Sequence, residues 1–167
     1  YDTGNGGITQ GSDAGNAIIA SHLVVTTTAR RQGGNIILDN TSNSVGTAAF
    51  TATGNVTLND SIALTLNSAS LAGYALTLND SGGSITQGSG AITAASVNAT
   101  TTASSAAITL TNMSNSFGAL TLSASGDGSI YDTAALTVDG ASVGNGNTLT
   151  ITDTNSGGIH QGAGSAN

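Results

Sequence analysis

Two nested periods constrain the fold of this chain more than any other feature of its sequence. The longer period is about 75 residues, a spacing typical of repeat architectures, because GGITQG at 6–11 returns as GGSITQG at 82–88 and again as GGIHQG at 157–162. A second landmark keeps the same order, since NTSNSVG at 40–46 returns as NMSNSFG at 112–118. Self-similarity at a fixed spacing predicts a repeat protein whose units stack on one another.

A shorter period divides each long one. Apolar residues that lead strand-like runs recur at a mean spacing of about 19 residues, close to the short repeats of solenoids, and they are Ile18, Ile36, Val56, Leu76, Ile92, Ile108, Ile130 and Leu149. We therefore expect about nine short turns in one continuous segment, 1–167, in which the long repeats occupy about 8–84 and 85–158.

The runs have the pattern of half-buried strands. In VTL at 56–58 and LTL at 76–78, apolar residues alternate with Thr, and a period of two is typical of a strand with one buried face. Gly, Asn and Ser separate the runs and suit corners. A unit this short cannot bury its apolar face alone, so successive turns must stack in parallel. The predicted fold is all-β: a right-handed parallel β-helix (β-solenoid) of about nine rungs with a narrow aliphatic core.

Asn or Asp follows the strand-like run in most turns. The residues at this place are Asn40, Asp60, Asp80, Asn112, Asp132 and Asp153. Stacked at a corner, such side chains can hydrogen-bond main-chain groups and link one turn to the next. We interpret them as a structural ladder in preference to a ligand site.

Composition argues against several classes of function. The net charge is −7 with only two basic residues, whereas binding a phosphate backbone needs many basic contacts, so we expect no nucleic-acid partner. The longest apolar runs, such as AIIA at 17–20, are far shorter than the roughly 20 residues of a membrane helix, so we expect no membrane insertion. The chain has no proline, which suits segments that all donate to hydrogen-bond ladders.

No residue pattern predicts catalysis, a cofactor or a metal site. His22 and His160 occupy unrelated places in the repeat, and no Ser/His/Asp set is evident. Segments 4–13 and 126–132 share glycines and aspartates with calcium-binding β-rolls, but they lack the tandem nonapeptide. We expect a protein that is not an enzyme.

Two further groups of residues have ordinary explanations. The threonine triplets at 26–28 and 100–102 recur once in each long repeat, whereas an ice-binding face would need a threonine on every turn, so we interpret them as outward β-formers. Arg30 and Arg31 are interpreted as solvated charges at a corner loop.

The segments AITLTNMSNSFGALTLSASGDGSI at 107–130 and NIILDNTSNSVGTAAFTATGNVTL at 35–58, together with GGSITQGSGAIT, carry a family resemblance. They are similar to the repeat region of the filamentous haemagglutinin family, the large exoproteins of two-partner secretion. That resemblance implies a β-helix shaft exported through an outer-membrane pore and displayed on, or released from, the bacterial cell surface.

The expected function is therefore the structural shaft of a large secreted surface adhesin, serving display and adhesion. Its expected partners are further copies or a continuation of the same chain, with host-cell or matrix carbohydrate or protein as candidate ligands. The alternative is a self-assembling extracellular filament subunit that stacks end to end, because strand edges at open ends recruit further strands.

Overall fold

The computed structural model describes residues 6–28, 33–71 and 73–163. These residues form an all-β parallel solenoid of about seven turns, in which the only helical segment described is the short 3-10 turn η1 (Ala14–Asn16). The strands are β1 (Ile8–Thr9), β2 (Ile19–Thr26), β3 (Ile36–Leu38), β4 (Ser44–Thr51), β5 (Val56–Asp60), β6 (Leu64–Ser70), β7 (Ala75–Asp80), β8 (Ile85–Gln87), β9 (Ile92–Thr101), β10 (Ile108–Leu110), β11 (Ser116–Ala124), β12 (Gly128–Asp132), β13 (Leu136–Val143), β14 (Leu149–Asp153) and β15 (Ile159–Gln161).

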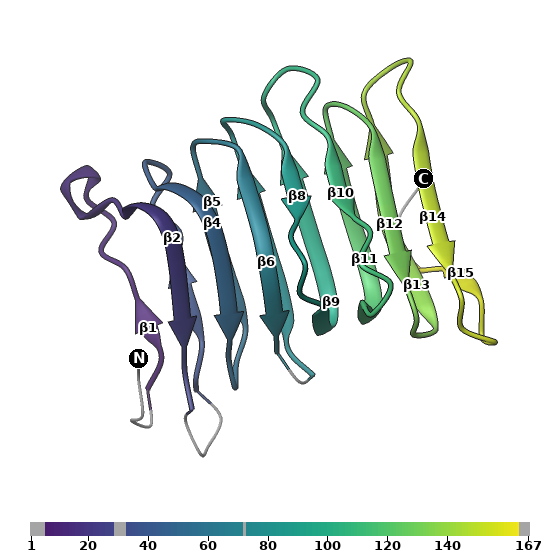
Figure 1. Ribbon diagram of the computed structural model, residues 1–167, viewed down its shortest axis with the longest axis horizontal. Coiled ribbons are helices and arrows are strands. Elements are labelled where there is room, and N and C mark those ends of the chain that lie inside the picture. The colour runs from purple at the N-terminus through teal and green to yellow at the C-terminus, as the bar shows by residue number, and fades with distance from the viewer. Residues whose placement is uncertain (1–5, 29–32, 72, 164–167) are drawn as a thin grey trace.

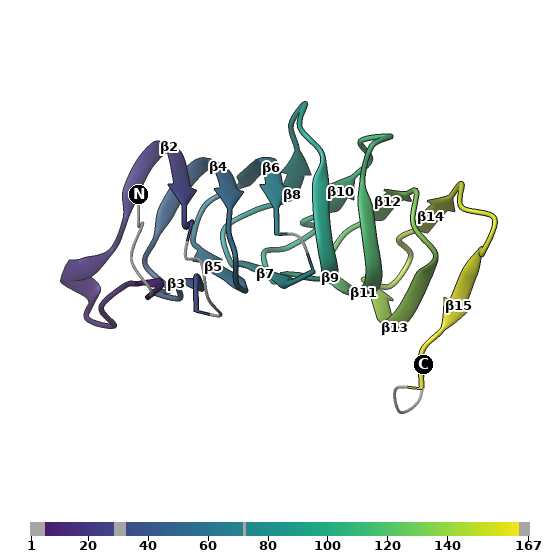
Figure 2. The same ribbon diagram turned by 90° about the horizontal axis from the view of Figure 1, so that it is seen from below.

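Every strand pairing is parallel, and the strands stand side by side along the long axis from β1 at one end to β15 at the other (Figure 1). The odd-numbered strands pair with one another and so do the even-numbered ones, and the two columns lie on opposite sides of the solenoid (Figure 2). A turn therefore contains one strand of each column. One pairing joins the columns, because the start of β9 pairs with the end of β6.

The register differs from the one that the short sequence period predicted. Ile36, Val56 and Leu76 are paired neighbours as expected, but Leu76 pairs next with Val97 and not with Ile92. Ile92 pairs instead with Ala69 at the end of β6. The stretch from Leu76 to Ile92 is too short to complete a turn, because β8 has to be placed in the even column between them. Turns are thus longer on average than the short sequence period, and nine rungs are not confirmed.

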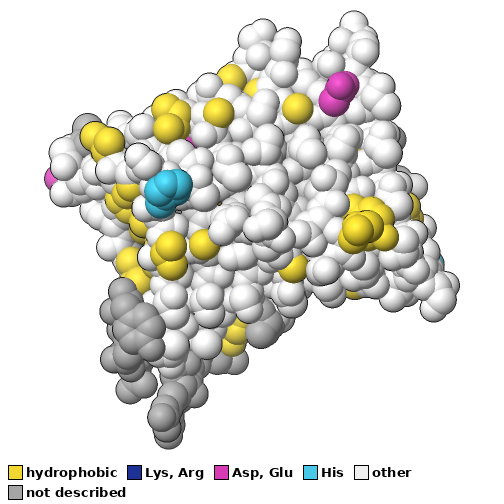
Figure 3. Space-filling model, in the orientation of Figure 1, with side chains coloured by type: hydrophobic (Ala, Val, Ile, Leu, Met, Phe, Trp, Pro, Cys, Tyr) yellow, Lys and Arg dark blue, Asp and Glu magenta, His cyan; other side chains and the backbone are white. Residues whose placement is uncertain are grey.

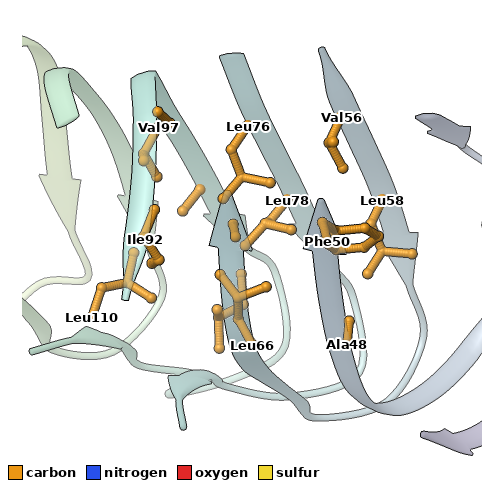
Figure 4. Close-up of a cluster of buried hydrophobic side chains, with 14 of the residues drawn as sticks. Ala48, Phe50, Val56, Leu58, Leu66, Leu76, Leu78, Ile92, Val97 and Leu110 are labelled. Atoms are coloured by element: carbon orange, nitrogen blue, oxygen red, sulfur yellow. The ribbon is translucent and has the colours of Figure 1, made fainter. Parts of the chain in front are cut away.

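The core is a continuous aliphatic column, as the sequence predicted. Alternating residues of both strand columns point inward and meet along the axis, as the close-up of Figure 4 shows for part of the chain. Phe50 and Phe117 are the two phenylalanines, and both are fully buried among Leu, Ile, Val and Ala side chains. Because turn stacks on turn, the inward apolar side chains of the inner turns are covered by the turns above and below them.

Strand length reveals a shift of half a turn within the solenoid. The even strands β2, β4 and β6 have 8, 8 and 7 residues, while the odd strands β3 and β5 between them have 3 and 5. Further along, the odd strands β9, β11 and β13 are the long ones, with 10, 9 and 8 residues. The alternation changes column at β7 and β8, two consecutive short strands. Corresponding surfaces before and after this point therefore face opposite sides.

Candidate functional site

The six Asn and Asp residues that the sequence predicted as a ladder lie in two groups. The first group follows or ends β3, β5 and β7 in the odd column, and the second follows or ends β10, β12 and β14 in the even column. The first group is Asn40, Asp60 and Asp80, and the second is Asn112, Asp132 and Asp153. Each group spans neighbouring turns, but the half-turn shift separates the two groups on opposite sides.

Asp60 and Asp80 are paired in register on neighbouring turns, and both are buried at the corner that ends their strands. Asp60 Oδ1 accepts a hydrogen bond from the main-chain N–H of Val45 (2.8 Å) in the preceding turn, whereas its Oδ2 is buried without a hydrogen-bond partner. Burial therefore raises the pKa of Asp60 to about 6, partly offset by the main-chain N–H groups of Val45, Ser61 and Ile62 and increased slightly by the Asp80 charge.

The carboxylate of Asp80 accepts more hydrogen bonds than that of Asp60. Its Oδ1 accepts the main-chain N–H groups of Gly82 and Gly83 (both 2.8 Å), and its Oδ2 accepts that of Leu64 (3.1 Å) in the preceding turn. Burial still raises the pKa of this carboxyl group, against the opposing effect of the three N–H groups. The carboxylate thus closes its own corner and bonds it to the neighbouring turn.

Asp132 repeats this arrangement on the opposite side. Its carboxylate accepts the main-chain N–H groups of Phe117 (2.9 Å) and Ala134 (3.1 Å), and burial raises its pKa, with a smaller contribution from the charge of Asp153. Asp153 is its register partner and accepts the N–H of Asn155 (2.7 Å). These contacts are those of a corner brace.

The most completely bonded polar residues were not among those singled out from the sequence. Asn115 is fully buried, and its Oδ1 accepts hydrogen bonds from Gln87 Nε2 (2.6 Å) and the main-chain N–H of Ile92 (2.9 Å). Its Nδ2 donates to Gln87 Oε1 (2.9 Å) and to the carbonyl groups of Leu110 and Tyr131 (both 3.2 Å). One side chain therefore joins four strands' ends in three neighbouring turns.

Asn43 makes the same set of contacts in the first half of the chain. Its Oδ1 accepts from Gln10 Nε2 (2.6 Å) and from the N–H of Ile18 (2.8 Å). Its Nδ2 donates to Gln10 Oε1 (3.0 Å) and to the carbonyl groups of Leu38 and Asn59 (both 3.1 Å). The sequence signal was present, because Asn43 and Asn115 occupy the same place in NTSNSVG and NMSNSFG, and both glutamines lie in the ITQG landmark.

The two networks stand seven strands apart, since Asn43 follows β3 and Asn115 follows β10. Because each turn holds two strands, seven strands correspond to three and a half turns. The first network consequently lies in the odd column and the second in the even column.

The threonine triplets do not point outward as a whole. Their central members, Thr27 and Thr101, are buried, and each hydroxyl donates to a carbonyl group within its own corner, that of Gly34 (2.7 Å) and of Ala106 (2.9 Å). The prediction of outward triplets was wrong for these two residues. Their hydroxyl groups turn inward because carbonyl groups buried at a corner need hydrogen-bond donors. A ladder of threonines on successive turns does exist in the even column, formed by the paired residues Thr47, Thr65, Thr86 and Thr109.

The remaining sequence candidates give no assembled site. His22 and His160 are both exposed and lie in different columns, on β2 and β15. Within the described parts of the chain, no three His or Asp side chains gather as metal ligands would. Over the same residues, no helix is long and apolar enough to cross a membrane. Arg30 and Arg31 lie outside the described residues.

A surface hollow of about 240 Å³ lies at the corner where β5, β7 and β9 end, and we call it the corner hollow. One side is lined by an outward row of register partners, Asn59, Asn79 and Thr100. The other side is lined by Thr41, Ser81 and Thr102, and Asp60 and Asp80 contribute to the lining between the two rows.

A second hollow, of about 390 Å³, lies over β2 and β4, and its lining includes Ile19 and Ile62. Ile19 is 82% exposed. On the face shown in Figure 3, hydrophobic side chains form small separate groups, charged side chains are rare, and the backbone and side chains of other types cover most of the area.

Comparison with known proteins gives one partial match. Residues 53–123 match the family described as repeats of unknown function (DUF5649). This segment is less than half of the chain and runs from the corner before β5 into β11. It includes the row Asn59, Asn79 and Thr100 of the corner hollow, and both residues of the Gln87–Asn115 contact. No curated protein and no solved structure matches the chain.

Proposed function

We propose that this chain is a segment of the structural shaft of a large secreted bacterial surface protein, which displays that protein on the cell surface and takes part in adhesion. The observation that supports this best is the unbroken parallel pairing from β1 to β15, with one apolar core along the axis. In such a solenoid each turn contacts only its neighbours, so length is gained by adding turns without changing any local contact.

We further propose that the shaft is right-handed and grows by the long unit of about 75 residues that the sequence repeats. The handedness is supported by the strong preference of parallel strand crossovers for that hand. The unit is supported by the recurrence of the Gln–Asn network, in which Gln10 and Asn43 are replaced by Gln87 and Asn115. Because this unit spans three and a half turns, successive units would present the same surface on alternating sides of the shaft, which suits contact with partners from either side.

Secretion and display are supported by the resemblance to the repeat region of two-partner secretion exoproteins. A chain without cysteine suits passage through a pore in the unfolded state, because no disulfide has to be kept open or reduced.

The shaft proposal is tested by adding a unit. The variant carries a second copy of residues 40–111, inserted after residue 111. This insertion keeps the order of strands and Asn-containing corners unchanged and adds three and a half turns. At about 4.8 Å per turn, the maximum dimension from small-angle X-ray scattering should increase by about 17 Å. An inserted chain that is unfolded, or folded with unchanged length, would contradict the proposed unit. The matched control is an insertion of residues 40–75, which breaks the phase and should destabilise the chain.

The adhesive role and the filament alternative are separated by two measurements on the unaltered chain. Electron microscopy after size exclusion should show short monodisperse rods, whereas long fibres would favour the self-assembling filament subunit. Beads coated with the chain should bind cultured epithelial cells above the level of beads coated with the urea-unfolded chain. Equal binding of the two would argue against an adhesive surface on this segment.

A further inference from the structure

We infer that the corner hollow is a binding site for one residue of a neutral oligosaccharide. This inference rests on the proposed adhesive function and assigns its ligand class and location. The hollow is small compared with the roughly 300–1,000 Å³ of pockets for drug-sized ligands, so its 240 Å³ suits a single sugar ring with the rest of the chain outside.

The lining offers both hydrogen-bond donors and acceptors. Along the row of Asn59, Asn79 and Thr100, the two amides form a chain of hydrogen bonds that runs in one direction. Asn79 Nδ2 donates to Asn59 Oδ1 (2.8 Å), and Asn59 Nδ2 donates to the carbonyl of Asp39 (2.6 Å). Both amides are thereby fixed in orientation, and the chain of bonds leaves Asn79 Oδ1 as an acceptor at its open end. The hydroxyl of Thr100 stands next to it in register and can donate to or accept from a ligand.

The charge of the site favours a neutral ligand with hydroxyl groups. The described residues include no Lys or Arg, so nothing in the hollow can pair with an anionic ligand. Asp60 lies in the lining with a buried Oδ2 that has no partner, and Asp80 is its neighbour. A ligand hydroxyl near this corner gains a favourable interaction with negative charge that a carboxylate or phosphate would lack.

A calcium ion fits this corner less well. Asp80 uses both carboxylate oxygens on main-chain N–H groups, and Asp60 uses one, so only one carboxylate oxygen is free. Calcium takes six to eight oxygen ligands and is bound tightly only where several carboxylates converge. The methyl groups of Thr41, Thr100 and Thr102 would instead contact the C–H surface of a sugar ring.

The second network gives a natural comparison for the hollow. By register and by distance along the chain, Tyr131 corresponds to Asn59, and Met113 corresponds to Thr41. The same corner geometry therefore carries small hydrogen-bonding side chains on one side of the shaft and larger ones on the other. These residues supply substitutions that the fold already accommodates at equivalent positions.

The test is a titration of the ¹⁵N-labelled chain with cellotriose, maltotriose and chitotriose, followed by NMR. With at least one sugar, at about 10 mM, we expect shifts at the side-chain amide of Asn79 and the main-chain amides of Thr100 and Thr102. The double variant Thr41→Met/Asn59→Tyr should weaken binding at least tenfold. The matched control Thr121→Ala, an outward residue on the same column outside the hollow, should bind like the unaltered chain.

Other outcomes overturn the inference. Absence of shifts with all three sugars, shifts spread evenly over the surface, or unchanged binding by the double variant would each reject the site. Shifts at Asp60 and Asp80 on addition of calcium chloride alone would identify the hollow as a cation site and reject the sugar site. The dichroism spectrum of the variant shows whether the solenoid is intact, and the rod length shows whether the shaft proposal survives a failure of sugar binding.

Discussion

Replacing Asn115 by alanine tests the claim that a buried amide network, more than the apolar core alone, fixes how the turns stack. Asn115 is 0% exposed, and its side chain is the hydrogen-bond partner of the Ile92 N–H and of both ends of the Gln87 amide. Truncation leaves the Ile92 N–H unpaired in the interior. It also removes one partner from each end of the Gln87 amide, which keeps its bonds to the Gly90 carbonyl and the Asn112 N–H. A buried unsatisfied polar group costs about 1–3 kcal/mol, so we expect a loss of about 3 kcal/mol in the free energy of unfolding.

The loss is measurable by urea denaturation followed by circular dichroism, and hydrogen exchange reports it locally. The Ile92 amide should lose its protection in Asn115→Ala, because its acceptor is the removed side chain. The control is Asn112→Ala in the same corner, whose side chain makes its bonds to Ser89 (2.7 Å) and Ser114 (2.9 Å) near solvent. This variant should lose about 1 kcal/mol.

Equal losses in the two variants, or continued protection of Ile92 in Asn115→Ala, would refute the reasoning. A double variant with Gln87→Ala should lose less than the sum of the single losses, because two of the hydrogen bonds join the glutamine and asparagine amides to each other and are lost in either single variant.

Burial and charge give three further predictions. The pKa of Asp60 is about 6 in the folded chain against 3.8 in the unfolded one, so the folded state binds the proton more tightly. Stability should be highest below about pH 4 and fall by about 3 kcal/mol as pH rises from there through 6. Urea midpoints of Asp60→Asn should show a flatter dependence on pH. Gly82→Ala should destabilise the chain by about 2 kcal/mol or more in thermal melts, because the added Cβ would overlap main-chain atoms of the neighbouring turn, whereas Gly15→Ala, with open space around it, should be neutral. Leu66→Ala should cost about 2–5 kcal/mol in urea denaturation through a core cavity, and Met113→Ala, at a 74% exposed position, should cost less than about 0.5 kcal/mol.

The sequence predicted the parallel all-β solenoid and much of its interior. Alternation in runs such as that of Leu76 and Leu78 identified inward residues, and both are fully buried. It also predicted polar residues at the ends of strands, and Asp60 and Asp80 do end their strands in register. These features are local: they depend on which of two faces a side chain takes, and a period of two decides that.

The corner hollow and the Gln–Asn networks could not be predicted from the sequence in the same way. The hollow is formed by residues at the ends of β3, β5, β7 and β9, which belong to four successive turns, and it includes Thr41, Asn59 and Thr102. Asn115 bonds to Gln87 28 residues before it, and the recurring motifs showed that both residues return without showing that they meet. Such contacts depend on how many residues each turn takes, and the corners set that number.

The sequence alone therefore determined the class of this fold, because short alternating strands with glycine-rich and asparagine-rich corners cannot bury their apolar faces except by stacking. The tertiary structure decided which strand stacks on which. Ile92 was predicted to pair with Leu76 on the neighbouring turn. Instead β8 pairs with β6 in the even column, Ile92 pairs with Ala69, and Leu76 pairs with Val97, so the register moves by half a turn. The physical reason is that alternation fixes the face of each residue, whereas pairing between turns is fixed by corner length and by buried side chains such as Asn43 and Asn115 that bond across them.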